Sequence, residues 1–274
     1  MACVLEASAP KAGNVHPGQS FADMHFAHFV AAADCIADSI ANNVGSMELG
    51  ELIWQCVQVT LANVGVNTSL GTILLVAPIA HAQQSTEHGK LPDRIANLLA
   101  ILTADDSQWV YRAIAHCSPG GIGEEQENDI RGSAPPDLVK AMEQVAHMDA
   151  VARQYVNAFE DVFQLAEWLA DELKASQNIL DAICRLQIRW LSQNQDGLII
   201  RKLGEKAAKS VQDKAAGVAV QLNNYSRPLA ETPDYQEFDL YLRSDRNRLN
   251  PGTTADLIAA ALFVRLLEGY AGKA

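Results

Sequence analysis

Residues 70–83 read Leu-Gly-Thr-Ile-Leu-Leu-Val-Ala-Pro-Ile-Ala-His-Ala-Gln, a stretch that would be apolar on every side of a helix. A helix that is apolar all round is buried among other elements of a core. Pro78 stands inside the stretch, where a proline removes a backbone hydrogen bond, so we expect it to kink or end the helix. The stretch is also too short to span a membrane. It therefore predicts the central helix of a soluble core.

Apolar residues recur at helical spacing along almost all of the remaining chain. The predicted helices cover 20–42, 49–61, 95–102, 151–175, 180–190, 207–222 and 254–270. No segment alternates between apolar and polar residues for long enough to indicate a strand. We therefore predict an all-α protein, with a single large bundle-like domain over residues 1–274.

The composition excludes several classes of function. The chain has 274 residues, of which 49% are hydrophobic and 20% charged, and its formal net charge is −12. A strongly acidic chain is a poor ligand for nucleic acid or an anionic membrane. Five cysteines without a CxxC pair, and an early carboxylate at Glu6 in place of an apolar leader, favour reduced thiols and a cytoplasmic location.

Two segments at opposite ends of the chain share an unusual mix of residues. Residues 6–18 read Glu-Ala-Ser-Ala-Pro-Lys-Ala-Gly-Asn-Val-His-Pro-Gly, and residues 250–256 read Asn-Pro-Gly-Thr-Thr-Ala-Asp. Each combines a Pro/Gly turn, small polar side chains and a carboxylate, and each precedes a predicted helix. Because the start of a helix offers free N–H groups and a positive dipole end, a phosphorylated ligand held between the two turns is the first hypothesis.

The N-terminal segment admits two interpretations. Lys11 and His16 can pair with phosphate oxygens, and Asn14 can donate to one. The alternative is a helix cap, because Ser20 followed by Asp23 resembles a capping box at the start of the next helix. From the residues alone the two interpretations are about equally supported.

The C-terminal segment is the more specific of the two. Pro251 and Gly252 shape a turn, and Thr253 or Thr254 would cap the following helix. Asp256 is expected in the first turn of that helix. There it could offset the helix dipole, or it could hold Mg²⁺ that bridges a polyphosphate.

Two segments in the middle of the chain are less specific. The run from 63 to 72 is rich in Asn, Thr, Ser and Gly, and it is either a ligand site or a turn capped by Asn67 or Ser69. Arg201 and Lys202 stand beside a glycine in a chain that is short of cations, and they are either phosphate ligands or a solvated helix face. No GxxxxGK[ST], GxGxxG, HExxH or GxSxG pattern is present, which removes the common nucleotide-binding and hydrolase templates.

Taken together, five stretches resemble the triphosphoribosyl-dephospho-CoA synthase family, whose members make the precursor of the prosthetic group of citrate lyase and malonate decarboxylase. The stretches run in the family's order over nearly the whole chain and cover 6–16, 21–24, 65–71, 196–204 and 250–256. The resemblance implies an all-α fold and a transfer of triphosphoribose from ATP to dephospho-CoA with release of adenine. It implies ATP and dephospho-CoA as small-molecule substrates, with Mg²⁺ as a cofactor.

The resemblance also implies roles for particular residues. Glu6, Asp23 and His16 are the candidate catalytic residues, and Asp23 and Asp256 are the candidate magnesium ligands. The remaining residues of the motifs would bind the nucleotide. They are Ser8, Lys11, Gly13, Asn14, Asn67, Thr68, Gly71, Asp196, Arg201, Lys202, Gly204, Asn250, Gly252, Thr253 and Thr254.

Several alternatives stay open. The first turn, and the mid-chain segment 129–134, differ from citrate-lyase-type members, so the acceptor could be related to dephospho-CoA, as in one-carbon cofactor synthesis. A non-catalytic protein that binds a nucleotide or a coenzyme A derivative, and a helical nucleotide hydrolase, are the competing classes. A homodimer, and a lid formed by the acidic loop 118–136, are further hypotheses.

Overall fold

The computed structural model describes residues 1–85, 88–117, 134–222 and 227–271. Within these residues the chain forms α-helices, one 3₁₀ turn at Leu229–Glu231 and no strand, so the all-α prediction is confirmed. The chain divides into two compact units. The first unit consists of residues 1–26 and 162–274, and the second of residues 27–161. The single-domain hypothesis stays a prediction.

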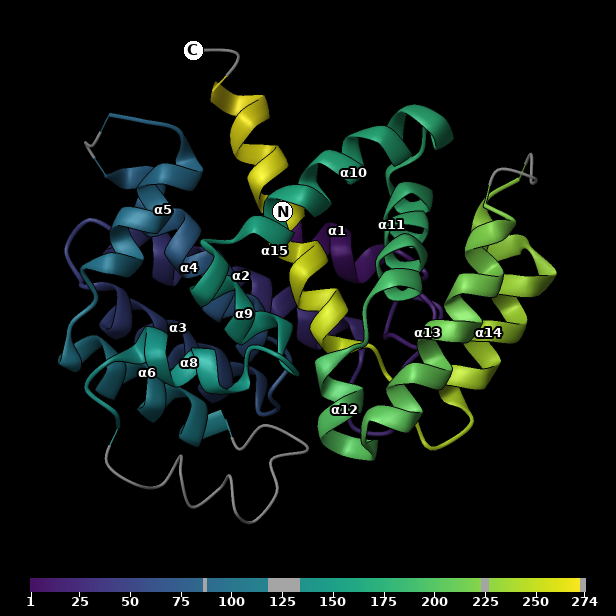
Figure 1. The fold of residues 1–274 in the computed structure, drawn as a ribbon, viewed down its shortest axis with the longest axis horizontal. Coiled ribbons are helices and arrows are strands. Elements are labelled where there is room, and N and C mark those ends of the chain that lie inside the picture. Colours follow the sequence, from purple (N-terminus) through teal and green to yellow (C-terminus); the bar gives the residue numbers. More distant parts are fainter. Residues whose placement is uncertain (86–87, 118–133, 223–226, 272–274) are drawn as a thin grey trace. The chain divides into compact units, whose positions relative to one another are not determined.

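The first unit has a hydrophobic core around its last helix. α15 packs against α1, α11 and α12, and its residues Leu257–Leu262 are all buried. Figure 1 shows α13 beside α11 and α14 in this unit. The helices are α1 (Ala2–Ser8), α10 (Glu160–Ser176), α11 (Ile179–Gln193), α12 (Gly197–Leu203), α13 (Glu205–Val220), α14 (Pro233–Arg243) and α15 (Gly252–Ala271).

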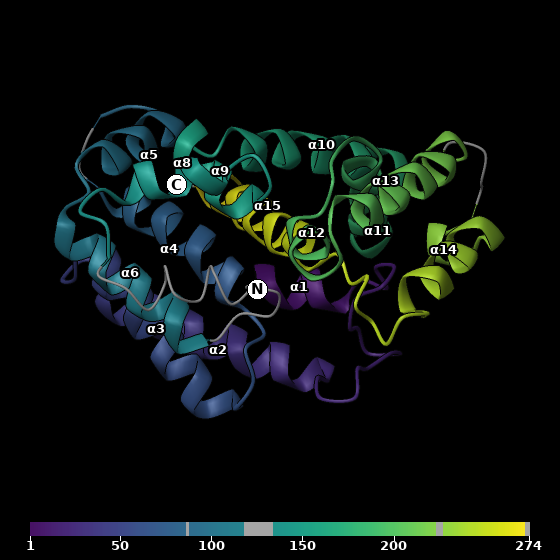
Figure 2. The same ribbon diagram turned by 60° about the horizontal axis from the view of Figure 1, so that its bottom comes forward.

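The second unit is built around α4, as the apolar stretch predicts. Ten residues of α4 are buried, and the helix contacts α3, α5 and α9 (Figure 2). Pro78 does not end the helix, which continues to Gln84. The helices are α2 (Phe26–Asn43), α3 (Leu49–Val64), α4 (Leu70–Gln84), α5 (Leu91–Ala100), α6 (Ala104–Cys117), α8 (Leu138–Val145) and α9 (Ala150–Asn157).

The prediction of one long helix over 151–175 is wrong, because the structure has a break between α9 and α10. Ala158 and Phe159 adopt left-handed backbone angles, with φ of 54° and 67°. Phe159 is fully buried, so the break turns its ring into the core. Helical spacing continues across the break, and the sequence alone therefore gives no sign of it.

Two expected helix starts are also wrong. α2 begins at Phe26, and the Phe21 N–H donates to the Met24 carbonyl, so Ser20 and Asp23 do not form a capping box for that helix. Asp23 lies in an exposed bend instead. α15 begins at Gly252, two residues earlier than predicted, which places Asp256 in its second turn.

Candidate functional site

The N-terminal and C-terminal turns meet in the first unit, as the sequence predicts. The Asn14 Nδ2 group donates to Asn250 Oδ1 over 2.8 Å. Asn14 is buried, and Asn250 is half-buried just before the start of α15. This contact joins segments that are separated by 236 positions in the sequence. The two turns therefore belong to one local structure.

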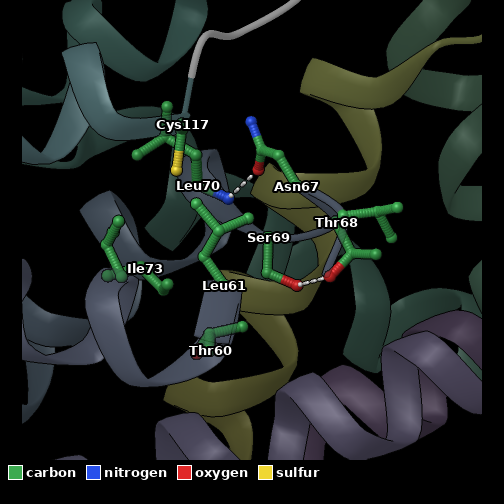
Figure 3. Close-up of a pocket in the computed structure, with 10 residues that line it drawn as sticks. Thr60, Leu61, Asn67, Thr68, Ser69, Leu70, Ile73 and Cys117 are labelled. Carbon is green, nitrogen blue, oxygen red and sulfur yellow. Dashed lines mark hydrogen bonds between the residues drawn. The ribbon is translucent and has the colours of Figure 1, made fainter. Parts of the chain in front are cut away.

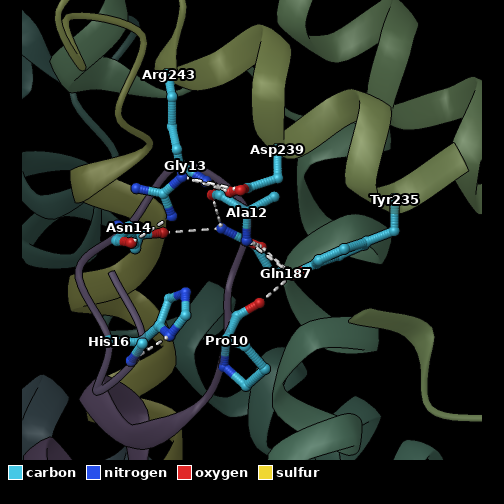
Figure 4. Close-up of polar contacts among 10 residues, drawn as sticks. Pro10, Ala12, Gly13, Asn14, His16, Gln187, Tyr235, Asp239 and Arg243 are labelled. Carbon is cyan, nitrogen blue, oxygen red and sulfur yellow. Dashed lines mark hydrogen bonds and ion pairs between the residues drawn. The ribbon is translucent and has the colours of Figure 1, made fainter. Parts of the chain in front are cut away.

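The segment that precedes Asn14 is held by side chains from α11 and α14. The Ala12 N–H donates to Gln187 Oε1 over 2.9 Å and to the Tyr235 hydroxyl over 2.7 Å. Gln187 Nε2 returns a hydrogen bond of 2.9 Å to the Ala12 carbonyl, and Tyr235 donates to the carbonyl of Pro10. Figure 4 shows these contacts. The backbone conformation of the motif is therefore set by residues far away in the sequence.

Gly13 is required by both its conformation and its surroundings. Its φ is +74°, and a Cβ at this position would lie 2.8 Å from the Leu242 side chain. The Gly13 N–H donates to Asp239, which also holds the Arg243 guanidinium. Arg243 in turn donates to the Asn14 carbonyl over 2.7 Å. Any side chain at position 13 would push this arrangement apart.

Lys11 and Glu6 form a buried ion pair. Lys11 Nζ lies 2.8 Å from Glu6 Oε1 and 2.6 Å from the Glu6 carbonyl oxygen, and the Lys11 side chain has no exposed surface. A buried charge is tolerated when it is paired and hydrogen-bonded in this way. In this structure both charges are engaged with each other. A contact of either with substrate stays a prediction.

Asp196 is a fully buried carboxylate that caps two helices. Its Oδ1 accepts from the N–H groups of Leu198 and Ile199 at the start of α12. Its Oδ2 accepts from the N–H and the hydroxyl of Thr254 in the first turn of α15, over 2.7 and 2.8 Å. Burial raises the pKa of Asp196, and the hydrogen bonds from Thr254 and Ile199 oppose that rise.

Thr253 and Gly252 also join α15 to α12. Thr253 accepts a hydrogen bond from the Leu198 N–H over 3.0 Å, which ties α15 to α12 a second time. A Cβ at Gly252 would lie 2.6 Å from the Leu198 side chain. The C-terminal turn is thus packed directly on α12. The polar groups of Asp196, Thr253 and Thr254 are engaged in joining these two helices.

Cations gather at the other end of α12. Arg201 and Lys202 form its last turn, and both are half-buried, so they are not a fully solvated face. Burial lowers the pKa of Lys202, Asp196 and Asp23 act to raise it, and Arg201 and Arg248 act to lower it further. The cations Arg201 and Arg248 and the exposed carboxylate Asp23 therefore all lie within electrostatic reach of Lys202.

His16 lies in the same group of polar residues as Asn14, Asp239 and Arg243 (Figure 4). Burial lowers the pKa of His16, the cation of Arg243 lowers it further, and Asp239 acts in the opposite direction. The ring Nδ1 accepts from the Gly18 N–H over 3.2 Å. Because an accepting nitrogen carries no proton, the neutral ring holds its proton on Nε2.

The remaining predicted site residues of this unit are Ser8, Gly204 and Asp256, and each has different neighbours. The Ser8 hydroxyl donates to the Val4 carbonyl within α1. Gly204 joins α12 to α13 with a φ of +83°. Asp256 is half-buried in α15 and lies close enough to Cys3 to help raise the pKa of that thiol, although burial is the larger cause.

The side chains that the structure describes do not form a magnesium site by themselves. Within the described ranges, no cluster of three or more His, Cys, Asp or Glu side chains could hold a metal ion. The assignment of Asp23 and Asp256 as magnesium ligands therefore stays a prediction.

Asn67, Thr68 and Gly71 belong to the second unit, at the start of α4. Asn67 Oδ1 accepts from the Leu70 N–H over 3.3 Å, so the turn is capped by Asn67, one of the two interpretations of the sequence. The hydroxyls of Thr68 and Ser69 lie 3.0 Å apart (Figure 3). They line a cavity of about 10 Å³, which is the space of about one water molecule. The turn has a structural role, and its contact with nucleotide stays a prediction.

Five residues around the site do not stand out in the sequence. They hold the N-terminal turn or lie near Lys202, and they come from α11, from α14 or from the connection between α14 and α15. A lone polar residue in such a helix gives no signal, because most of them face solvent. The missed residues are Gln187, Tyr235, Asp239, Arg243 and Arg248.

Two further expectations concern the rest of the chain. The proposed acidic lid lies mostly outside the described residues, since positions 118–133 are not among them. In the part of the chain that the structure describes, no helix is long and apolar enough to cross a membrane.

Comparison with known proteins identifies the family. A family model described as ATP:dephospho-CoA triphosphoribosyl transferase matches residues 1–274. Among solved structures, the chain is similar to a protein from Archaeoglobus fulgidus described provisionally as a triphosphoribosyl-dephospho-CoA synthase. The two are 23% identical, the match covers 88% of this chain and 99% of the other, and the TM-score is 0.67, which shows a shared fold. No curated protein matches the chain at a significant level. Because the family model spans every residue, the chain belongs to the family of ATP:dephospho-CoA triphosphoribosyl transferases, as its five motifs imply.

Proposed function

We propose that this chain transfers the triphosphoribosyl group of ATP to dephospho-CoA, and that the reaction takes place in the first unit beside the last turn of α12. The observation that carries this placement is the group of Arg201, Arg248 and Asp23 around Lys202, in a chain whose net charge is −12. Arg201 and Lys202 are half-buried, whereas Arg248 is exposed and pairs with Asp245. Half-buried cations bind phosphate more strongly than fully solvated ones, because their charge is less screened. A triphosphate is the ligand that such a cluster suits.

The reaction needs one bond to form and one to break. The 2′-hydroxyl of dephospho-CoA attacks the anomeric carbon of the ATP ribose, and the C–N bond to adenine breaks. The hydroxyl proton passes to the Asp23 carboxylate, which later releases it, and the departing adenine takes up a proton from solvent. The transition state resembles an oxocarbenium ion, which carries positive charge at the anomeric carbon. The negative charge of the Asp23 carboxylate, placed beside that carbon, also stabilises this transition state.

His16 is suited to help the leaving group. The neutral ring presents an Nε2–H donor, since its Nδ1 accepts from Gly18. Adenine gains electron density as the C–N bond breaks, and a hydrogen bond to one of its ring nitrogens strengthens at that moment. The role of Glu6 is then to hold Lys11 and the N-terminal turn, which follows from their buried ion pair.

Mg²⁺ fits this arrangement with Asp23 as its protein ligand. Magnesium in nucleotide sites takes one or two carboxylates and completes its shell with substrate phosphates and water, so it needs no cluster of protein ligands. Asp23 is exposed and lies near Lys202. When bound, the ion would neutralise part of the charge on the triphosphate. Asp256 remains a second candidate ligand.

The direct test is a mass-spectrometric assay of the purified chain with Mg-ATP and dephospho-CoA. We expect free adenine and triphosphoribosyl-dephospho-CoA to appear in equal amounts. Adenine without that product would indicate a different acceptor, as the alternative of a one-carbon cofactor pathway implies. Phosphate release would indicate a nucleotide hydrolase, and ATP binding without any product would indicate a non-catalytic binder.

The Asp23→Asn variant tests the assignment of Asp23, which is both the proposed base and the proposed magnesium ligand. Loss of a positioned general base typically costs about 10²- to 10⁴-fold in rate, and we expect kcat to fall in that range with the unfolding free energy unchanged. Asp34→Asn is the matched control, because Asp34 is an exposed carboxylate on α2 of the second unit. Normal turnover by Asp23→Asn would refute the proposed role.

A further inference from the structure

Three carboxamide side chains form a continuous relay that ends at the C-terminal turn. Gln187 Nε2 donates to Asn14 Oδ1 over 2.9 Å, and Asn14 Nδ2 donates to Asn250 Oδ1 over 2.8 Å. Gln187 is fully buried and Asn14 nearly so, whereas Asn250 is half-buried. The relay therefore runs from the core of the first unit to its partly exposed turn.

The polarity of the relay is fixed at its buried end. The Ala12 carbonyl can only accept and the Ala12 N–H can only donate, and both pair with the Gln187 carboxamide over 2.9 Å. This pairing decides which end of Gln187 is oxygen and which is nitrogen. Gln187 Nε2 then requires an acceptor at Asn14, and Asn14 Nδ2 requires an acceptor at Asn250. Each amide dictates the orientation of the next.

We propose that Gln187 is a positioning residue which, acting through Asn14, turns the Asn250 carboxamide so that its Nδ2 group donates to a triphosphate oxygen of ATP. With Oδ1 of Asn250 engaged by Asn14, the Nδ2 group is the end of the amide left to face a ligand. A Cβ at Gly252 would lie 3.6 Å from this nitrogen, which places it beside the first turn of α15. That turn packs on Leu198 at the start of α12, and the last turn of the same short helix carries Arg201 and Lys202.

This inference rests on the proposed function, since it takes ATP as the ligand of the first unit. It adds the role of Gln187 in orienting Asn250, which the five family motifs do not include. Gln187 lies outside all five motif stretches, and its effect on ATP is exerted through two intervening amides. A correctly oriented donor strengthens binding, whereas a flipped amide would present an oxygen to the phosphate and weaken it.

The variant Asn14→Asp tests the relay by reversing its polarity. An aspartate at position 14 can accept from Gln187 with one oxygen, but its other oxygen can only accept as well. Asn250 must then rotate to donate its Nδ2 group to position 14, which turns Oδ1 toward the ligand. We expect the Kd for Mg-ATP, measured by calorimetry, to rise about 10- to 100-fold, the usual range for a lost hydrogen bond to a charged group.

A double-mutant cycle separates this effect from the added negative charge. Asn14→Asp is made in the wild-type chain and in Asn250→Ala, where no amide remains to be flipped. The repulsion between the new carboxylate and ATP is present in both backgrounds and cancels. The relay predicts that Asn14→Asp weakens ATP binding at least about 10-fold more in the presence of Asn250 than in its absence. An equal loss in both backgrounds would overturn the proposal.

Two further variants guard against a loss of folding. Asn14→Ser removes both relay contacts without adding charge, and we expect a Kd increase that again disappears in the Asn250→Ala background. Asn42→Asp is the matched control for charge, because Asn42 is exposed on α2 and its side chain donates to the Asp38 carbonyl of the same helix. Thermal unfolding of each variant shows which ones are folded at the temperature of the binding measurement.

The cycle and the activity assay fail in distinguishable ways. Wild-type protein that binds ATP but forms no product with dephospho-CoA refutes the proposed acceptor, and the cycle on Kd still decides the relay. Product formation with an additive cycle supports the proposed function and refutes the relay. Adenosine in place of ATP tests the assigned phosphate contact, since its Kd should not change with Asn14→Asp.

Discussion

Asp196 and Lys202 stand at opposite ends of the seven-residue helix α12, and both belong to the same family motif. Asp196 is fully buried and accepts four hydrogen bonds from the protein. Lys202 is half-buried and lies among other cations near Asp23. One motif therefore contains a residue that holds the architecture and a residue suited to bind phosphate. The difference follows from burial rather than from residue type.

The two terminal motifs also contain both buried residues and half-buried residues. Glu6, Lys11 and Gly13 are enclosed by contacts that come from the protein itself. His16 and Asn250 are half-buried at the edge of the same structure. We infer that the buried residues fix the turns and that the half-buried ones meet the substrate. The following variants test that division, in order of their expected effect on stability.

Asp196→Ala should have the largest effect on stability. It leaves the N–H groups of Leu198, Ile199 and Thr254 without their acceptor, and each buried unsatisfied group costs about 1–3 kcal/mol. We expect the free energy of unfolding to fall by at least about 3 kcal/mol, measured by urea denaturation. A stable Asp196→Ala protein that has lost only ATP binding would place Asp196 in the ligand site instead.

Thr254→Val should have a smaller effect of the same kind. Its hydroxyl is buried and donates to Asp196 over 2.8 Å, so the substitution removes one hydrogen bond and leaves the side-chain volume nearly unchanged. We expect a loss of about 1–3 kcal/mol, while Thr254→Ser, which keeps the hydroxyl, should lose about 1 kcal/mol or less. A large change in the Kd for ATP without a stability change would contradict the assignment of Thr254 to the scaffold.

Lys202→Met should show the opposite pattern. Because burial lowers the pKa of Lys202, its charge is poorly accommodated in the folded protein, and its removal should change the unfolding free energy by less than about 0.5 kcal/mol. We expect kcat/KM for ATP to fall about 10- to 100-fold, as for a lost hydrogen bond to a charged group. Lys206→Met, an exposed lysine on α13, is the matched control and should retain full activity.

His16 should give the smallest effect, visible as a pH dependence. Its folded-state pKa is lowered from 6.5, so the unfolded chain binds more protons in the window between the folded pKa and 6.5. The contribution of His16 to stability is therefore present above pH 6.5 and is lost as the pH falls through the folded pKa. Denaturation curves between pH 5 and 7.5 should show this loss in the wild type and a weaker dependence in His16→Gln.

Fold class was accessible from the sequence because burial of helices imposes a regular spacing on apolar residues. The stretch at 70–83 predicted the most buried helix of the second unit correctly. The break at Ala158 and Phe159 was not accessible, because the spacing continues across it and the left-handed conformation is stabilised by burying Phe159. Spacing reports which face of a helix is buried and does not report where the backbone turns.

The sequence by itself determined the family, through five motifs in order, and it predicted the meeting of the two turns, which the contact between Asn14 and Asn250 confirms. Only the tertiary structure decided which motif residues are enclosed. Asp196 and Lys202 look equally available in the sequence, and the contacts that separate them come from α15 and from the N-terminal segment. Gln187 is the extreme case. Its role depends on hydrogen bonds to residues 173 and 175 positions away, and hydrogen bonds over such separations leave no pattern in the chain.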